Sequence, residues 1–106
     1  MVFAVLSFPT GALLDDIARS RAPASLTLAT VGDFLDQCRD RWGKGQALIV
    51  ELGDVGEIDT AGAQLLAWLQ REGRLTGRAV TLDSPPARVI ETMAMLGLGK
   101  GVSDGS

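Results

Sequence analysis

The chain has 106 residues, of which 46% are hydrophobic and 22% charged, and this composition predicts one compact domain with an apolar core. Its formal charge of -3 argues against a nucleic-acid surface, because neutralising phosphates requires a clustered excess of Lys and Arg. With one cysteine and no histidine, the sequence excludes an internal disulfide and any Ser-His or Cys-His nucleophile system within this chain.

The first segments of the chain are expected to form a strand and a short helix. Residues 2 to 8, "VFAVLSF", are almost continuously apolar and precede Pro9 and Gly11, which is typical of a buried strand and a turn. We predict one or two helical turns over residues 12 to 18, a break over 20 to 25, and a short strand over 25 to 28. The start lacks the basic residues of a secretory signal, and no apolar run reaches the roughly 20 residues that cross a bilayer. A cytoplasmic protein without membrane insertion is therefore expected.

The next segments predict a helix over residues 30 to 42 and a strand over 46 to 52. Thr30 is the expected N-cap, with Asp33 three residues later as in a capping box. One face of this helix carries Val31, Phe34, Leu35 and Cys38. The lone thiol of Cys38 is expected to be buried in the core rather than reactive. "QALIVEL" is the best strand of the chain, and its apolar residues predict a central strand buried on both faces.

The second half of the chain predicts two helices and another strand. A helix begins near Thr60 and ends at Gly73 or Gly77, and "AVTLD", residues 79 to 83, is the next strand. Ser84 as N-cap and Pro85 as first helical residue predict the start of the last helix. Its buried face is expected to contain Val89, Met93 and Leu96. Residues 99 to 106 are expected to form a flexible tail.

The order of these elements predicts a small α/β sandwich, with a mixed sheet of about four strands covered by about four helices. The strand at 46 to 52, the helix from residue 60 and the strand at 79 to 83 form a strand-helix-strand unit, which predicts neighbouring parallel strands. The functional edge is expected where the carboxyl ends of strands meet the N-termini of helices, because unpaired amide groups gather there.

Residues 56 to 69, "GEIDTAGAQLLAWL", place two adjacent capping residues before a helix that needs only one. Asp59 is the expected cap, which leaves the hydroxyl of Thr60 directed toward solvent. Gly62 lies in the first turn of the helix, where glycine costs roughly 0.5–1 kcal/mol relative to alanine. We interpret this glycine as clearing space for an approaching surface.

Three stretches of the chain, covering about residues 24 to 98, resemble the STAS domain of bacterial anti-sigma factor antagonists. "LIVELGDVGEIDTAGAQLLAWL" resembles the central strand, the Asp-Ser/Thr-x-Gly motif and the Leu-rich helix of that family. "VTLDSPPARVIETMAMLGL" resembles its last strand and helix, and "LTLATVGDFLDQC" is similar to its first helix. The resemblance implies a single STAS-like domain over residues 1–106, of which residues 1 to 23 match least.

The resemblance also implies a function. In such antagonists, a partner kinase that is also the anti-sigma factor phosphorylates the hydroxyl after the motif Asp, and the dephosphorylated form binds that partner. Transferred to this chain, the acceptor is Thr60, and no enzymatic activity, cofactor or metal is implied. The implied partner-binding residues are Asp54, Glu57, Asp59, Thr60, Ala61, Gly62 and Gln64. Many such antagonists carry Gly-Glu-Leu-Asp before the first helix, whereas here "ASLT" places Thr27 where that Asp would be.

Other roles remain open at this point. STAS domains also serve in a phospholipid-transport ABC complex and as chemotaxis-associated proteins, and the Asp-Thr-Ala-Gly motif of this chain resembles those two more closely. Self-association is open as well. A receiver domain using Asp15, Asp16 and Asp54 would bind magnesium through these acids. An enzyme would have to use the acids of residues 51 to 59, and an exposed Trp42 or Trp68 could contact a partner.

Overall fold

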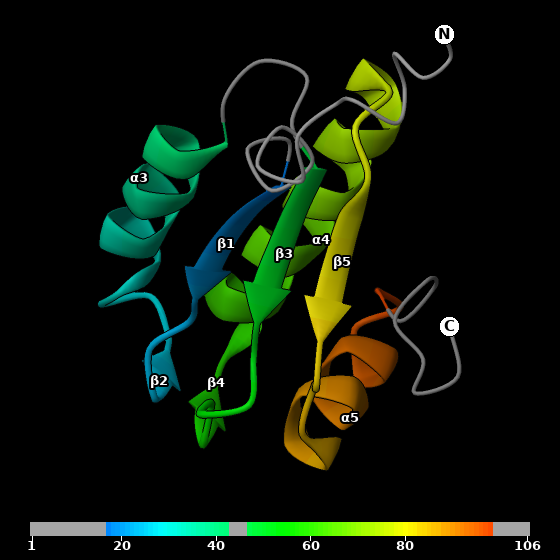
Figure 1. Cartoon of the computed structure of the whole chain (residues 1–106). Helices are drawn as coiled ribbons and strands as arrows, with labels where there is room; N and C mark the ends of the chain where they lie inside the picture. The colour runs from blue at the N-terminus through cyan, green and yellow to red at the C-terminus, as the bar shows by residue number, and fades with distance from the viewer. Residues whose placement is uncertain (1–16, 43–46, 99–106) are drawn as a thin grey trace, which may run out of the picture.

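The computed structural model describes residues 17–42 and 47–98 (Figure 1). Its strands are β1 (Ile17–Arg21), β2 (Ser25–Leu26), β3 (Ala47–Glu51), β4 (Glu57–Ile58) and β5 (Val80–Asp83). Its helices are α3 (Val31–Arg41), α4 (Thr60–Thr76) and α5 (Ala87–Met95). The α/β class expected from the sequence is confirmed. The predicted strand at residues 2 to 8 and the predicted tail at 99 to 106 lie outside the described residues.

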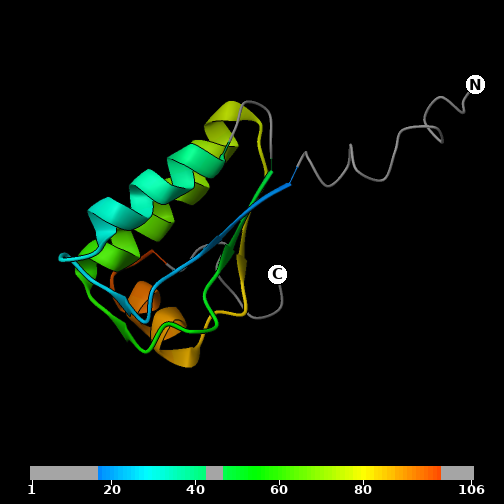
Figure 2. The ribbon, with the colours of Figure 1, turned by 60° about the vertical axis from the view of Figure 1, so that its left-hand side comes forward.

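The strands form a three-stranded parallel sheet in the order β1-β3-β5 and a separate parallel pair of β2 and β4. The central place of β3 and its parallel pairing with β5 agree with the sequence prediction. However, α3 and α4 lie on the same side of this sheet (Figure 2). Leu48 and Val50 face these helices and are fully buried, whereas Ile49 lies between Arg19 and Thr81 on the other face and is half-buried. The prediction that this strand is buried on both faces is therefore wrong.

The structure has the strand β1 where the sequence predicts helical turns, at residues 17 and 18, and a break, at residues 20 and 21. The predictions for these residues are therefore wrong. In β1, the buried side chains alternate with exposed ones, and the buried ones are Ala18 and Ser20. Their small size gives the alternation little hydrophobic contrast, which hides the two-residue period of a strand. It also lets α3 pack closely over β1.

The helix α3 starts at the predicted place, but its predicted capping box is wrong. Thr30 is the N-cap residue, yet its side chain makes no capping hydrogen bond, and Asp33 is exposed. Phe34 and Cys38 are buried as predicted. Burial raises the pKa of the Cys38 thiol, which keeps it protonated and suits a packing role.

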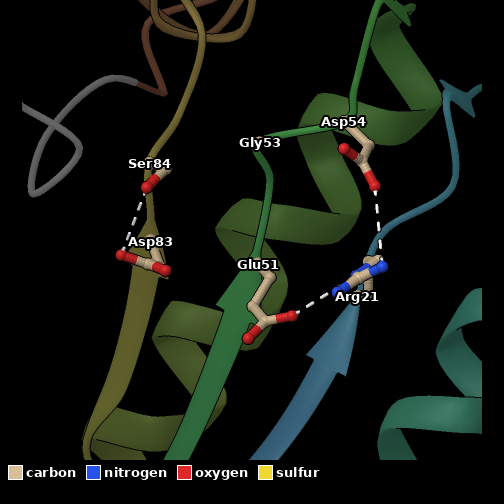
Figure 3. A pocket seen from close by; sticks show the side chains of 6 residues that line it. All are labelled: Arg21, Glu51, Gly53, Asp54, Asp83 and Ser84. Carbon is tan, nitrogen blue, oxygen red and sulfur yellow. Dashed lines mark hydrogen bonds and ion pairs between the residues drawn. The ribbon is translucent and has the colours of Figure 1, made fainter.

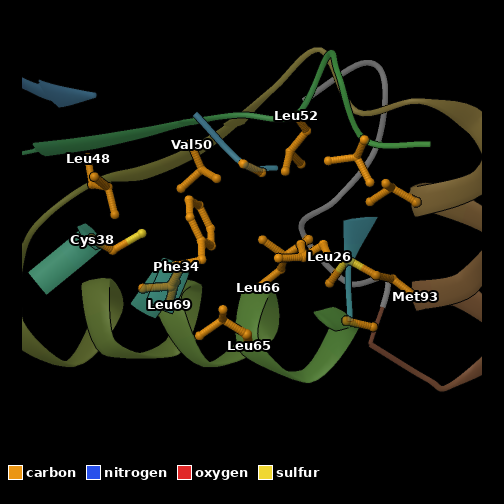
Figure 4. Close-up of a cluster of buried hydrophobic side chains, with 14 of the residues drawn as sticks. Leu26, Phe34, Cys38, Leu48, Val50, Leu52, Leu65, Leu66, Leu69 and Met93 are labelled. Carbon is orange, nitrogen blue, oxygen red and sulfur yellow. The ribbon is translucent and has the colours of Figure 1, made fainter. Parts of the chain in front are cut away.

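The core lies between the sheet and α4, where leucines from both sides meet (Figure 4). Leu66 and Leu69 of α4 are completely buried. The helix ends at Gly77, whose positive φ of 73° is the left-handed conformation of a glycine C-cap. Gly73 lies within the helix, where an added Cβ would collide with the carbonyl oxygen of Arg78 and with Val80. The C-terminal half of α4 is therefore in close contact with the chain that leads into β5.

The helix α5 begins later than the sequence predicts, at Ala87 with Pro86 as N-cap. A proline disfavours helical conformations in the residue before it, so Pro86 keeps Pro85 out of the helix. Ser84, the predicted cap, instead has a positive φ of 54°. Val89 and Met93 are buried as predicted, but Leu96 lies beyond the helix and is 40% exposed. Over the described residues, no helix combines the length and apolar character needed to span a membrane.

The contrast between two leucines of α4 tests the position of the core. Leu66→Ala should lower the free energy of unfolding by about 2–5 kcal/mol, because it leaves a cavity in a closely packed site. Leu75→Ala should change it by less than about 0.5 kcal/mol, because Leu75 is 74% exposed. Urea unfolding followed by circular dichroism measures both. Equal losses would contradict the placement of α4.

Candidate functional site

The carboxylate of Asp59 connects the start of α4 to the loop after β2. Its Oδ1 accepts a hydrogen bond of 3.0 Å from the backbone N–H of Gly62, so Asp59 is the N-cap, as the sequence predicts. Its Oδ2 accepts a second bond of 3.0 Å from the backbone N–H of Leu28, 31 residues earlier. The sequence does not predict this second hydrogen bond. One side chain thus fixes both a helix start and a distant loop.

These hydrogen bonds also determine the charge of the site. The N–H groups of Leu28 and Gly62 lower the pKa of the Asp59 carboxyl below its usual value of 3.8, because they stabilise the ionised form. The positive end of α4 acts in the same direction. Asp59 is therefore ionised at neutral pH and presents a fixed negative charge beside Thr60.

The pairing of β2 with β4 places the two loops side by side. Ser25 is opposite Glu57 and Leu26 is opposite Ile58 in the parallel register. The hydroxyl of Ser25 donates a hydrogen bond of 2.9 Å to Oε1 of Glu57. Glu57, one of the predicted partner-binding residues, is therefore in a cross-strand contact three residues before Thr60, where α4 starts.

The Thr30 hydroxyl holds the loop before α3 in a fixed turn. It donates to the carbonyl of Ser25 at 2.7 Å and accepts from the backbone N–H of Thr27 at 3.0 Å. Together with the bond from Leu28 to Asp59, these contacts fix the turn at both ends. The turn presents Leu28, whose side chain is 75% exposed although it is a large apolar residue. The sequence does not reveal this exposed position, because it predicts a strand at Leu28.

Gly62 has a different role from the one inferred from the sequence. It is buried, and a Cβ at this position would collide with the carbonyl oxygen of Leu26 and lie 3.0 Å from Cγ1 of Ile58. The glycine thus makes room for the backbone of β2 within the same chain. The interpretation that it clears space for an external surface is wrong.

Thr60 is the first residue of α4 and is exposed, as predicted. Within the described ranges, no hydrogen bond involves its side chain, because Asp59 already caps the helix. Gln64 is also exposed and lies one helical turn further along the same side of α4. Leu28, Asp59, Thr60 and Gln64 together are referred to below as the Thr60 face. Ala61, next to Thr60, is half-buried.

Asp54 lies at a different place, a hollow of about 260 Å³ at the carboxyl edge of the three-stranded sheet (Figure 3). Arg21 stands there between two acids, with Nε 3.5 Å from Oε1 of Glu51 and a guanidinium nitrogen 3.9 Å from Oδ2 of Asp54. Of the acids considered for a receiver domain, Asp15 and Asp16 lie outside the described residues. Within residues 17–42 and 47–98, no three potential metal ligands lie together.

The fold and the site define a small α/β domain that exposes the N-terminus of its longest described helix on a fixed surface. A family model described as "Mlab, STAS domain" matches residues 21–103. The chain belongs to the STAS domain family, which agrees with the resemblance found in the sequence rather than with a receiver. A search of curated proteins found no match.

The role of Asp59 predicts a specific dependence of stability on pH. A carboxyl whose pKa is lowered by folding stabilises the folded state above its unfolded-state pKa, and this stabilisation disappears as the pH falls through the folded-state pKa. The substitution Asp59→Ala should therefore lower the Tm by several degrees at pH 7, and this difference should shrink as the pH falls below 3.8. Thermal unfolding at several pH values measures this difference. The control Asp36→Ala removes an exposed carboxylate from α3, and a similar pattern in that variant would contradict the assignment.

The same substitution at two glycines tests the close contact of α4 with β2. Gly62→Ala should lower the free energy of unfolding by about 1–3 kcal/mol, because the added methyl group meets the carbonyl of Leu26. Gly32→Ala near the start of α3 should raise it by about 0.5–1 kcal/mol, because nothing lies within 4 Å and alanine favours helices. Urea unfolding measures both values. Stabilisation by both substitutions would show that the contact with Leu26 does not exist.

Proposed function

We propose that this protein is a regulatory binding module that docks a partner protein through the Thr60 face. The supporting observation lies at the start of α4. Asp59 caps the helix, so the hydroxyl of Thr60 is exposed and makes no hydrogen bond to the described residues. STAS domains are typically binding modules rather than enzymes. We accordingly propose no catalytic activity for this chain.

The rigidity of the Thr60 face supports a docking role. The loop with Leu28 and the start of α4 are fixed to each other by hydrogen bonds, so a partner would not have to order them on binding. Leu28 provides apolar area that is 75% exposed, beside the polar groups of Asp59 and Thr60. An apolar contact surrounded by polar groups is typical of the centre of a protein interface.

Phosphorylation of Thr60 would act as a switch on this face. The phosphate would lie near the N-terminal amides of α4, which favour an anion. It would also add about -1.5 to -2 charge units beside the ionised Asp59, on a face whose other members are uncharged. A partner that fits the unmodified face would then meet strong negative charge. The corresponding partner is an anti-sigma factor with serine/threonine kinase activity or another regulatory protein.

A second candidate is a subunit of a phospholipid-transport ABC complex. It is favoured by the match to the family model described as "Mlab, STAS domain" and by the Asp-Thr-Ala-Gly motif, which resembles such subunits. In that role, the unmodified Thr60 face contacts the transporter's ATPase subunit continuously, and phosphorylation is not needed. A chemotaxis-associated role would use the same face.

Variants at Thr60 test the docking role. The wild type and Thr60→Ala should retain a specific partner from a lysate of the source cells, whereas Thr60→Glu should lose it, because the added charge repels the partner. Thr76→Glu introduces the same change at the other, exposed end of α4 and should leave partner capture unchanged. Quantitative mass spectrometry of the captured proteins is the measurement.

The identity of the lost protein separates the two candidates, since it is a kinase in one case and a transport ATPase in the other. Phosphate found on Thr60 of the native protein would support the switch. If all four forms captured the same proteins in equal amounts, while circular dichroism showed them folded, the docking role would be wrong.

A further inference from the structure

A groove with an aromatic floor runs along the outer side of α4, beyond the Thr60 face. Three hollows of about 350, 260 and 130 Å³ adjoin one another there, since each shares lining residues with a neighbour. Trp68 is common to the first two, while Ala67, Arg71 and Leu98 are common to the first and third. The six residues Arg39, Ala67, Trp68, Arg71, Arg74 and Leu98 are referred to below as the Trp68 groove.

The charge of this groove is opposite to that of the whole chain. The chain has 13 acidic and 10 basic residues, but the residues lining the three hollows include four arginines, one of them Arg78, and one acid, Glu72. Arg39, Arg71 and Arg74 form no ion pair with another described residue. Positive charge concentrated on an otherwise acidic protein attracts a negatively charged partner and orients its approach.

The floor of the groove is apolar. Trp68 is half-buried, lines the first and second hollows, and has the guanidinium carbon of Arg39 5.8 Å from its ring centroid. Leu98, also half-buried, lines the first and third hollows. Tryptophan and arginine are among the residues most enriched at the energetic hot spots of protein interfaces.

The geometry favours a helix as the bound element. From Gln64 in the first hollow to Arg74 in the third, the hollows follow α4 over ten residues, which corresponds to roughly 15 Å, or about three turns of a second helix. The backbone groups of α4 are used within the helix, so an extended peptide would find no main-chain partners there. A helix satisfies its own backbone and can place one apolar stripe over Trp68.

We propose that the Trp68 groove binds an acidic amphipathic helix of a partner protein. This rests on the proposed docking function, because Gln64 belongs both to the Thr60 face and to the first hollow, so the two surfaces are continuous. The partner helix places leucine-type side chains against Trp68 and Leu98. Its Glu or Asp side chains pair with Arg39, Arg71 and Arg74.

A synthetic helical peptide with leucines on one face and glutamates on the other tests the proposal against the full-length protein. Titration calorimetry should show binding that weakens with added salt, and a peptide with lysines in place of the glutamates should not bind. Trp68→Ala should weaken binding by roughly tenfold or more, and the double substitution of Arg71 and Arg74 by alanine by roughly fivefold. Arg88→Ala, at an exposed site on α5 outside the groove, should leave the affinity unchanged. The double arginine variant keeps the test valid if Trp68→Ala fails to fold.

Three results would overturn the proposal. The first is equal or absent binding of the acidic and basic peptides. The second is binding of the protein to phosphatidylglycerol vesicles, lost in the double arginine variant, without binding of the acidic peptide. The third is a dimer in analytical ultracentrifugation that the Trp68→Ala variant lacks. The peptide titration measures the Trp68 groove alone, so the groove can be confirmed even if the Thr60 variants show no effect on partner capture.

Discussion

The carboxylate of Asp59 fixes the arrangement of the Thr60 face. Its two hydrogen bonds, to the N–H groups of Gly62 and Leu28, connect the first turn of the main helix to a loop 31 residues away in sequence. Without them, the loop would be held mainly by the β2–β4 pair, which is two residues long on each side, and by the Ser25–Glu57 hydrogen bond. A pair of that length has few hydrogen bonds and is weak in isolation. The exposed groups at Leu28 and Thr60 keep their relative positions because the Asp59 carboxylate is hydrogen-bonded to both the loop and the first turn of the helix.

Glycines fix the helix α4 near both of its ends. Gly62 allows contact with the carbonyl of Leu26, and Gly73 allows contact with the chain entering β5. Between them, the leucines of the inner side pack on the sheet. The inner side is thus packed in the core, and the outer side, from Thr60 to Arg74, carries the exposed residues of the helix. Both proposed contacts use that outer side, one at its N-terminal end and the other along its length.

Most of the fold and the key residue of the site could be predicted from the sequence. The strongly apolar β3, the leucine stripe of α4 and the cap at Asp59 each have a clear local pattern, and these three elements position Thr60. Local patterns failed where a residue's role depends on distant partners. The alternation in β1 involves only small buried residues, Thr30 bonds to a neighbouring loop instead of its helix, and the exposure of Leu28 depends on the bond to Asp59. None of these contacts leaves a periodic signal in the sequence.

The buried position of Gly62 changes what its motif can reveal about a related protein. The aspartate and the glycine of Asp-Thr-Ala-Gly are both needed to build the junction between β2 and α4, whatever the domain binds. A related chain that had lost its partner would still be stabilised by both residues. Recognising the motif in a genome therefore identifies the architecture, whereas Thr60, the exposed residue between the cap and the buried glycine, has no part in these structural contacts.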